Sequence, residues 1–309
     1  MTARGAVAVV VLNWNGWDDT RECLESLREV NGCRVLLVDN GSTDGSVERA
    51  RSEFPEVEIV ENGANLGFTE GNNRGIERAL ADGAGYVMLL NNDTIVDRGF
   101  LEPMLDALER DGLGFASPQI LYADERNAVW FCGGEIDWRT GWAYHRKPDG
   151  GGPQRGLVPT VIATGCCLLA PRATWEQVGL LDQRFFLFWE DADWTLRATR
   201  SGHRGAVVTE SRIWHKVSRS FARGEPTLGT FYFVRNGLLF GRKHGPRDPS
   251  VALRFVWAWV VRPSLRDAID REPGWLRMGL LRASAVLAYL TRSFGAAPGY
   301  AVRIAARRR

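Results

Sequence analysis

The sequence predicts an α/β protein with a mostly parallel central sheet, flanked by helices and followed by a helical C-terminal extension. Short aliphatic runs alternate with amphipathic stretches through residues 6–110. Two of these runs, residues 35–38 and 87–90, stop abruptly on polar side chains, which is typical of buried parallel strands. From residue 227 onward the pattern is helical, and arginine interrupts its long apolar runs.

Four strand–helix pairs follow one another in the first part of the chain. Successive pairs of this kind form a parallel sheet with helices on both faces. Ser42 or Thr43 is the expected N-cap of the second helix. We expect strands at residues 6–12, 34–38, 57–61 and 86–90, and helices near 18–30, from about 44, near 70–81 and near 100–110.

The pattern becomes irregular after Gly112. Residues 128–165 are rich in glycine, tryptophan and turn residues, which indicates irregular strands and a mobile loop at the glycine run 150–153. A strand near 161–170 and helices near 174–178 and 192–201 should follow. We therefore divide the chain into one domain over residues 1–225, with halves at about 1–112 and 113–225, and a helical extension over 226–309.

Composition places the chain among folded proteins but hides a charge asymmetry. Of 309 residues, 45% are hydrophobic and 25% are charged, and the net charge is +2. Residues 226–309 nevertheless contain 15 Lys and Arg against 4 Asp and Glu. A basic segment attracts phosphates or an anionic surface, so a change of role is expected near residue 226.

Several classes of protein are disfavoured by what the sequence does not contain. Five cysteines without paired zinc spacing indicate reduced thiols and a cytoplasmic protein. The N-terminus does not resemble a signal peptide, and no uncharged apolar run is long enough to span a bilayer. The glycine motifs of P-loop ATPases and of dinucleotide-binding enzymes are missing.

Carboxylates at two strand ends predict a ligand site. Ligands of open α/β sheets bind beyond the carboxyl ends of the strands, which puts Asp39 and Asp93 on one crevice. Asp39 could accept hydrogen bonds from a base or a ribose, and a tight turn is the alternative. Asp93, with Asn91 two residues before it, suits Mg²⁺ or Mn²⁺ completed by a diphosphate. A strand-ending turn is the alternative there.

A second acidic group follows an aromatic run. Residues 185–189 are mostly aromatic and lead into Glu190, Asp191 and Asp193. Apolar surroundings raise the basicity of a neighbouring carboxylate, which favours a role as general base. The alternative is a helix start, in which Asp191 and Asp193 interact with the helix dipole. Taken alone, a histidine such as His215 is more often structural than a ligand. The guanidinium of Arg235 suits a diphosphate, but taken alone Arg235 is read first as a partner in a surface salt bridge.

Together, these stretches resemble the family 2 glycosyltransferases, in particular the branch with bacterial rhamnosyltransferases that build cell-envelope polysaccharides. The matching motifs occur in the order of the family and cover about residues 6–240. They are VLNWNG at 11–16, VDNGSTDGS at 38–46, NLGF at 65–68, GNNRG at 71–75, LNND at 90–93, TG at 164–165, FF at 185–186, EDAD at 190–193 and RN at 235–236.

The resemblance implies a GT-A fold with a nucleotide-sugar half at about 1–112 and an acceptor half at 113–225. It also implies inverting transfer by direct displacement. Asp93 would be the metal-binding aspartate of an Asp-x-Asp element whose first residue is Asn91 here, and His215 would be a metal ligand. Asp191 would be the general base and Glu190 a neighbour that orients it. The residues that would contact the nucleotide sugar are Asn13, Asp39, Asn65, Asn73, Asn92, Asp93 and Arg235.

These expectations define a metal-dependent inverting glycosyltransferase that uses Mg²⁺ or Mn²⁺. The expected donor is a nucleotide-diphosphate deoxyhexose of the deoxythymidine-diphosphate-rhamnose type, and the acceptor a glycan or a polyprenyl-diphosphate-linked sugar. An anionic membrane surface is a further expected partner of the C-terminal helices, with packing of these helices on the catalytic domain as the alternative. Nucleic acid is not an expected partner. The alternatives are a nucleotidyltransferase, disfavoured by the lack of Lys and Arg in residues 13–17, and a non-catalytic sugar-binding protein, disfavoured by intact Asp93 and Asp191.

Overall fold

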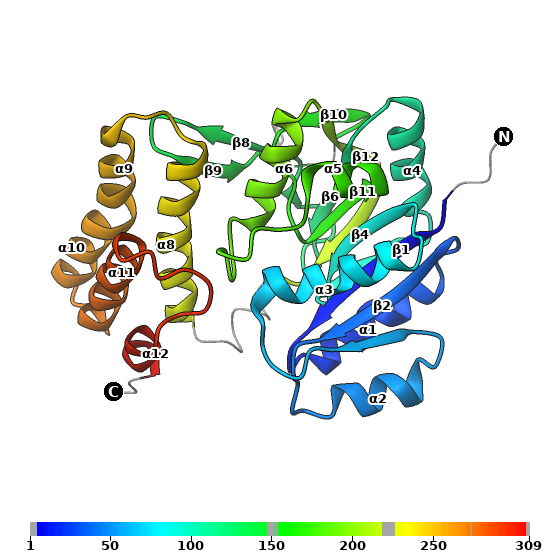
Figure 1. Ribbon diagram of the computed structural model, residues 1–309, viewed down its shortest axis with the longest axis horizontal. Coiled ribbons are helices and arrows are strands. Elements are labelled where there is room, and N and C mark those ends of the chain that lie inside the picture. Colours follow the sequence, from blue (N-terminus) through cyan, green and yellow to red (C-terminus); the bar gives the residue numbers. More distant parts are fainter. Residues whose placement is uncertain (1–4, 147–151, 153, 218–225, 273, 307–309) are drawn as a thin grey trace. The chain divides into compact units, whose positions relative to one another are not determined.

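The computed structural model describes residues 5–146, 152, 154–217, 226–272 and 274–306 (Figure 1). Most of the glycine run 150–153, where we expected a mobile loop, lies outside these residues. The chain forms two compact units. Unit 1 comprises Met1–Glu135, His145–Leu181 and Asp191–Ser220, and unit 2 comprises Ile136–Tyr144, Asp182–Glu190 and Phe221–Arg309.

Unit 1 is built on a ten-stranded sheet. Its main path runs β10-β12-β6-β11-β4-β1-β2-β3, with β5 paired to β12 and β7 paired to β6. A separate two-stranded sheet pairs β8 (Gly134–Asp137) with β9 (Trp142–His145). The ten strands are β1 (Val7–Asn13), β2 (Cys33–Asp39), β3 (Glu58–Glu61), β4 (Tyr86–Asn91), β5 (Thr94–Val96), β6 (Phe115–Tyr122), β7 (Val129–Phe131), β10 (Leu157–Thr160), β11 (Cys167–Pro171) and β12 (Gly205–His215).

The pairing directions divide the sheet. Strands β4, β1, β2 and β3 are all parallel, as the four strand–helix pairs predict. Strands β6 and β12 are also parallel to each other. Between these two groups, β11 runs antiparallel to both β4 and β6. The carboxyl ends of β1, β2 and β4 therefore meet at one edge.

Helices cover both faces of this sheet. On one face, Val7, Val9 and Val11 of β1 join a core with α1 and α4. On the other, Ala8 and Val10 join a core with α3 and α6. This alternation follows from the two-residue period of a strand. The helices of unit 1 are α1 (Trp17–Arg28), α2 (Ser46–Glu53), α3 (Gly67–Ala81), α4 (Leu101–Arg110), α5 (Arg172–Val178) and α6 (Glu190–Arg200).

Two expectations about local structure were wrong. Helix α2 begins at Ser46 with Gly45 as its N-cap, so neither Ser42 nor Thr43 caps it. Asp44 accepts the backbone N–H of Ser46 instead. Strand β11 begins at Cys167 rather than near residue 161, because residues before it form a turn that carries Thr164 and Gly165.

The GNNRG motif is explained by the packing of α3 on the sheet. A Cβ atom at Gly71 would lie 2.6 Å from Leu12 Cδ1, and one at Gly75 would lie 2.9 Å from Val38 Cγ2 and closer still to Val10. Both glycines therefore face β1 and β2, where only a hydrogen atom fits. The spacing of four residues places them on the same side of the helix.

Gly75→Ala should destabilise the protein by about 1–3 kcal/mol, the usual cost of an added methyl group in a packed core. Thermal or urea unfolding would measure the loss. Gly241→Ala is the matched control, because Gly241 is also helical and a Cβ there would meet nothing within 4 Å. The control should be neutral or stabilising by up to ~1 kcal/mol. Equal unfolding free energies for the two variants would contradict this account of the motif.

Unit 2 is mainly helical, as the sequence predicts. Its core is formed by residues from α8, α11 and α12, including Phe231, Leu281 and Ala301. Among the described residues, no helix combines the length and the apolar character needed to cross a bilayer. The helices are α8 (Pro226–His244), α9 (Pro249–Val256), the π-helical segment η1 (Trp257–Val261), α10 (Arg262–Ile269), α11 (Trp275–Leu290) and α12 (Gly299–Ala306).

An aromatic cluster completes unit 2. Trp142 stacks on Trp259 with ring centroids 4.0 Å apart and also contacts Phe233 of α8. Trp189 packs against Phe233 and Phe240 and donates its indole N–H to the Phe233 carbonyl at 3.1 Å. The segments 136–144 and 182–190 thus belong to the packing of the C-terminal helices, although they lie far from them in sequence.

Candidate active site

The ends of β1, β2 and β4 are aligned in register. Asn13 pairs with Asp39 across β1 and β2, and Leu12 pairs with Asn91 across β1 and β4. Because these strands are parallel, the polar residues that follow them gather at one edge. The structure thus brings Asn13 and Asp39 together, and Asn92 with them.

Asn13 is the centre of this polar group and is fully buried. Its Nδ2 donates to Asp39 Oδ1 and to Ser42 Oγ, both at 3.1 Å. Its Oδ1 accepts from Thr20 Oγ1 at 2.8 Å and from Asn92 Nδ2 at 3.5 Å. Asn13 therefore fixes the relative positions of the loops after β1, β2 and β4.

Asp39 lies in a tight turn after β2, which is the alternative that the sequence offered to a role in ligand binding. Its Oδ2 accepts the backbone N–H groups of Gly41 at 3.0 Å and Ser42 at 2.8 Å. The carboxylate thereby fixes the loop after β2, and Asp39 is only 3% exposed. A ligand at this edge would meet a preorganised loop, so the turn and a binding role are compatible.

Two other asparagines have partners in the backbone that the sequence did not predict. Asn65 is exposed, and its Oδ1 accepts from Gly67 N at 2.9 Å at the start of α3. Asn73 is buried and makes two hydrogen bonds with the backbone of Leu181, accepting at 3.0 Å and donating at 2.9 Å. Asn73 therefore holds the segment before α6 and lies apart from the group around Asn13.

Asp93 and His215 face each other. Asp93 Oδ1 lies 3.0 Å from His215 Nε2, and the side chains are 3% and 8% exposed. His215 is the last residue of β12, which pairs with β5 directly after Asp93. The ring of Trp130 packs edge-on against His215, with centroids 4.6 Å apart. Long-range strand pairing thus joins two residues that are more than a hundred positions apart.

Lys216 extends this arrangement to α1. Its backbone N–H donates to the Asp93 carbonyl at 3.0 Å, while its Nζ lies 3.3 Å from Asp19 Oδ1 and 2.7 Å from Glu22 Oε2. Buried lysines are rare unless they are paired. Lys216 therefore ties the end of β12 to α1 and fixes the backbone beside Asp93.

The donor set at Asp93 fits a divalent metal that a ligand helps to hold. A carboxylate oxygen and an imidazole nitrogen already converge in a nearly buried position, and both are metal ligands. Within the part of the chain that the structure describes, no cluster of three or more His, Cys, Asp or Glu side chains could hold a metal. Mg²⁺ commonly takes only one or two protein carboxylates plus phosphate oxygens, so this small set is adequate only with a diphosphate.

Asp191 lies near the N-terminus of α6. Its Oδ2 accepts from Gly165 N at 2.9 Å and its Oδ1 from Ala192 N at 2.7 Å. Burial raises the pKa of Asp191 above its ordinary value, although these N–H groups and Thr164 act in the opposite direction. A Cβ at Gly165 would lie 3.6 Å from Asp191 Cβ and 3.0 Å from the Phe68 ring. The Thr164-Gly165 motif therefore provides the space in which the carboxylate is held.

Cys166 links the two acidic positions. Its thiol is buried, and burial raises its pKa well above the usual range, with further contributions from the negative charges of Asp93 and Asp191. The backbone here also connects the two positions, because Gly165 N donates to Asp191 Oδ2 while Asn91, two residues before Asp93, donates to the Cys166 carbonyl. Cys166 precedes β11, and its carbonyl accepts from Asn91 N at 2.9 Å.

The turn before α6 is strained and is held by Asn236. Phe188 and Trp189 both have positive φ, at 69° and 75°, which is unfavourable for aromatic residues. Asn236 Nδ2 donates to the carbonyls of Leu187 at 2.8 Å and Phe188 at 3.2 Å. Glu190, buried at the start of α6, follows this turn directly.

Arg235 is buried rather than exposed, which excludes the surface salt bridge considered above. Its Nε donates to Asn236 Oδ1 at 2.9 Å and its Nη1 to the Ser293 carbonyl at 3.3 Å. Burial lowers the pKa of Arg235 to about 10. The guanidinium therefore orients the Asn236 amide, and contact with a phosphate remains a prediction.

Sequence reasoning missed three residues of this region. Lys216 and Cys166 acquire their places only through pairing of distant strands, and no local pattern marks them. Asn236 belongs to the RN motif, in which only Arg235 was given a role, because a cation suits a phosphate. The signal available for Asn236 was its position beside an arginine in the otherwise apolar stretch 231–240.

The strand-end polar group, the carboxylate–imidazole pair and the separate carboxylate at a helix start lie on an α/β sheet of the glycosyltransferase GT-A type, as the family and the solved structures below show. The chain belongs to glycosyl transferase family 2, whose family model matches residues 8–176. The predicted family and enzyme class are confirmed.

Two relatives have rhamnosyltransferase names. The N-acetylglucosaminyl-diphospho-decaprenol L-rhamnosyltransferase of Mycobacterium tuberculosis is 29% identical over 61% of this chain and 68% of its own length. The dTDP-rhamnosyl transferase RfbF of Shigella flexneri is 22% identical over 72% of this chain and 74% of its own length. The predicted resemblance to the rhamnosyltransferase branch is thus confirmed.

Solved structures confirm the fold. The mannosyltransferase PcManGT from Pyrobaculum calidifontis, in complex with GDP-Man and Mn²⁺, superposes with a TM-score of 0.57 at 16% identity, over 94% of this chain and 88% of that chain. GalNAc-T7 with UDP, GalNAc and Mn²⁺ gives a TM-score of 0.55 at 16% identity, over 68% of this chain but 43% of that chain. The α/β class with a GT-A-type sheet and C-terminal helices is therefore confirmed.

Proposed function

We propose that the protein is a metal-dependent inverting glycosyltransferase that moves rhamnose, or another deoxyhexose, from a nucleotide-diphosphate donor to an acceptor hydroxyl. One observation carries this proposal: the Asp93–His215 pair and Asp191 are separate acidic positions held at the same turn, where Gly165 donates to Asp191 and Cys166 accepts from Asn91, two residues before Asp93. Direct displacement needs stabilisation of the leaving group and removal of a proton from the attacking hydroxyl. Two nearby but distinct acidic positions match those two tasks.

Asp93 and His215 would hold a divalent metal, Mg²⁺ or Mn²⁺. When bound there, the metal supplies positive charge that favours departure of the diphosphate. The buried position strengthens the attraction between Asp93 and a cation, because little water screens the carboxylate. Lys216 keeps the Asp93 backbone in place through its hydrogen bond to the Asp93 carbonyl.

Asp191 would take the proton from the acceptor hydroxyl as the hydroxyl attacks. A carboxylate with a raised pKa is a stronger base than an ordinary one. Two backbone N–H groups, those of Gly165 and Ala192, donate hydrogen bonds to Asp191 and fix its orientation. Glu190, its neighbour at the start of α6, would tune or orient it.

The other strand-end residues would contact the nucleotide sugar. Asn13, Asp39 and Asn92 lie together at the edge of the parallel strands, where ligands of such sheets bind. Asn65 is exposed beside the N-terminus of α3. For Asn73 and Arg235, whose polar groups contact the protein itself, we propose supporting roles: Asn73 holds the backbone of Leu181, and Arg235 orients the amide of Asn236.

The names of the relatives support the choice of donor and acceptor. One is named for rhamnose and a decaprenol-diphosphate-linked N-acetylglucosamine, and another for dTDP-rhamnose. We propose the same classes for this chain: a nucleotide-diphosphate rhamnose and a polyprenyl-diphosphate-linked or polysaccharide acceptor. A nucleotidyltransferase remains the alternative within enzymes, and a sugar-binding protein the alternative without turnover, but no contact in the site favours either.

A panel of nucleotide sugars tests the proposed donor. With Mn²⁺ present, a donor at a hundred times its dissociation constant should stabilise the protein by about 2.7 kcal/mol. Incubation of that donor with a polyprenyl-diphosphate sugar should then give a product whose new linkage has the opposite anomeric configuration, as NMR would measure. Binding without turnover would favour the sugar-binding alternative, and a retained configuration would overturn the inverting mechanism.

Asn236→Ala should lower kcat by roughly 10–100-fold while leaving donor affinity nearly unchanged, because small misplacements of a reacting group are costly. The variant loses both hydrogen bonds that hold the strained turn before Glu190. Ser284→Ala is the matched control, since it also removes a buried side-chain hydrogen bond of unit 2, but one made within α11, from Ser284 to the Leu281 carbonyl. Equal kcat values for the two variants would rule out a positioning role for Asn236.

A further inference from the structure

Exposed apolar side chains are concentrated on the C-terminal helices. Of the fifteen large hydrophobic residues that are exposed among the described residues, eleven lie between Leu253 and Val302. Five of them follow one another at intervals of four residues along α9, η1 and α10, with exposed fractions from 36% to 78%. We call these five the stripe: Leu253, Trp257, Val261, Leu265 and Ile269.

The π-helical segment helps to keep the stripe on one side of the helix. In an α-helix of 3.6 residues per turn, residues four apart drift around the axis by about 40° per step. The residues Trp257–Val261 form a wider, π-helical turn, in which residues four apart fall short of a full turn. The drift is reversed over that step, which reduces the total rotation of the stripe around the helix axis.

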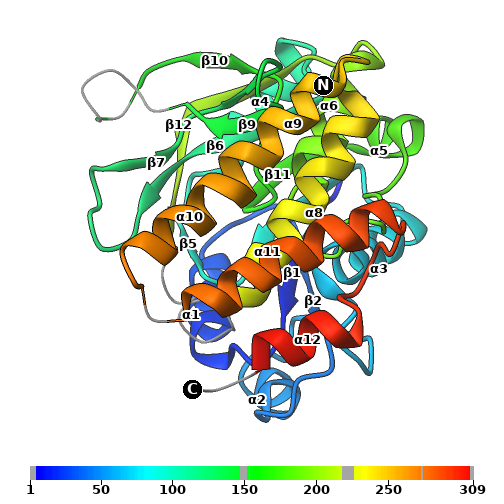
Figure 2. The same cartoon turned by 90° about the vertical axis from the view of Figure 1, so that its left-hand side faces the viewer.

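The neighbouring helix α11 is also apolar on its outer side. Leu281, Ala285 and Ala288 face the core of unit 2. The opposite side carries Leu276, Leu280, Ala283, Leu287 and Leu290, all exposed and spaced by three and four residues. A helix that is apolar on two sides is normally covered on both. Figure 2 shows α10 and α11 side by side, joined by an ion pair of 2.7 Å between Arg282 and Asp267.

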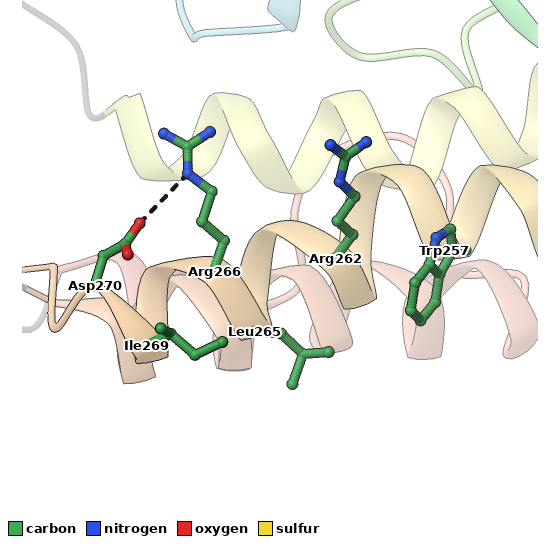
Figure 3. A pocket seen from close by; sticks show the side chains of 6 residues that line it. All are labelled: Trp257, Arg262, Leu265, Arg266, Ile269 and Asp270. Atoms are coloured by element: carbon green, nitrogen blue, oxygen red, sulfur yellow. Dashed lines mark ion pairs between the residues drawn. The ribbon is translucent and has the colours of Figure 1, made fainter.

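Arginines border the stripe. Figure 3 shows Trp257, Leu265 and Ile269 along one side of the helix and Arg262 and Arg266 on another. These side chains line a shallow pocket, with Asp270 paired to Arg266 at 3.5 Å. The exposed arginines of this part of the chain are Arg242, Arg247, Arg254, Arg262, Arg266, Arg271, Arg292 and Arg303.

We propose that the stripe and the outer side of α11 dock onto an anionic lipid surface. Interfacial helices combine Trp and Leu on one side with Lys and Arg beside them, and bind through buried apolar area and attraction to anionic lipids. A second copy of this chain would bring an equally basic surface to the same place, because residues 226–309 hold 15 positive against 4 negative residues. Charge complementarity therefore favours lipid over self-association.

Vesicle flotation with the full chain tests this proposal independently of any sugar transfer. The protein should float with vesicles that contain phosphatidylglycerol, should bind vesicles of phosphatidylcholine much more weakly, and should be released by salt. The double variant Leu265→Gln, Ile269→Gln should weaken binding by at least roughly tenfold, because two apolar side chains no longer enter the lipid. Arg262→Gln with Arg266→Gln should weaken it by about fivefold per arginine.

The matched control is Leu157→Gln with Val161→Gln, a change of two exposed apolar residues of unit 1. It should leave flotation unchanged, and unchanged melting temperatures would show that every variant is folded. Failure of the full chain to float, or equal binding of the stripe variant and the wild type, would overturn the proposal. A concentration-dependent dimer that the stripe variant abolishes would identify a second copy as the occupant and would likewise overturn it.

Discussion

Asp93→Ala should reduce sugar transfer by at least roughly 10³-fold and should remove the metal dependence of nucleotide-diphosphate binding. The carboxylate is 3% exposed and lies 3.0 Å from His215. Without it, one imidazole would remain to bind a divalent cation, which is too few ligands for a stable site. The charge that favours diphosphate departure would then be lost, and single electrostatic contacts of this kind already contribute 10²–10³-fold.

Calorimetric titration of a nucleoside diphosphate, with and without Mn²⁺, measures this prediction. Asp93→Asn should behave like the alanine variant while preserving the size of the side chain, which separates loss of charge from loss of packing. Asp124→Ala is the matched control, because Asp124 is exposed in the turn between β6 and β7. If either Asp93 variant retains metal-dependent nucleotide binding, the assignment of the metal site is wrong.

Asp191→Asn should lower kcat by about 10²–10⁴-fold, the usual contribution of a general base, while donor affinity stays nearly the same. The amide is close in size to the carboxylate and can still accept a hydrogen bond from Gly165 N. It cannot take a proton from the acceptor hydroxyl. Glu190→Gln should be milder, because Glu190 does not receive the proton in the proposed reaction.

The pH profile gives a second measure of Asp191. The base is active when deprotonated, so kcat/KM should fall as the pH drops through its pKa. Because burial raises that pKa, the acid limb should lie above pH 3.8, the ordinary value for an aspartate. Asp191→Asn should lack this limb. If the acid limb persists in Asp191→Asn but disappears in Glu190→Gln, Glu190 rather than Asp191 is the general base.

Local patterns predicted the parallel half of the sheet well. Aliphatic runs mark β1, β2 and β4, and the side chains at their ends, Asn13 and Asp39, do lie together because parallel strands end at one edge. Strand β6 was not predicted, and β11 was placed too early. Both belong to the part of the sheet where pairing joins distant segments, and such pairing leaves no periodic signal in a single stretch of sequence.

In the candidate site, too, local motifs predicted some residues, whereas contacts between distant segments place the others. Asp93 and Asp191 were predicted from motifs, whereas the contact of Asp93 with His215 depends on β5 pairing with β12. Lys216 and Cys166 could not be predicted, because their significance lies in charges from distant elements. Arg235 was assigned from its chemistry alone, and only its burial and its bond to Asn236 indicate a supporting role.

The chain passes between the two units five times, and this has a consequence for the order in which the protein can assemble during synthesis. Trp142 leaves the ribosome more than a hundred residues before Trp259, the ring on which it stacks, and Trp189 precedes its partner Phe233 by more than forty. Both tryptophans must stay exposed until the C-terminal helices emerge, and exposed aromatic surface on a nascent chain invites aggregation. Ribosome-bound chains that stop near residue 225 should therefore depend on chaperones more strongly than the complete protein does.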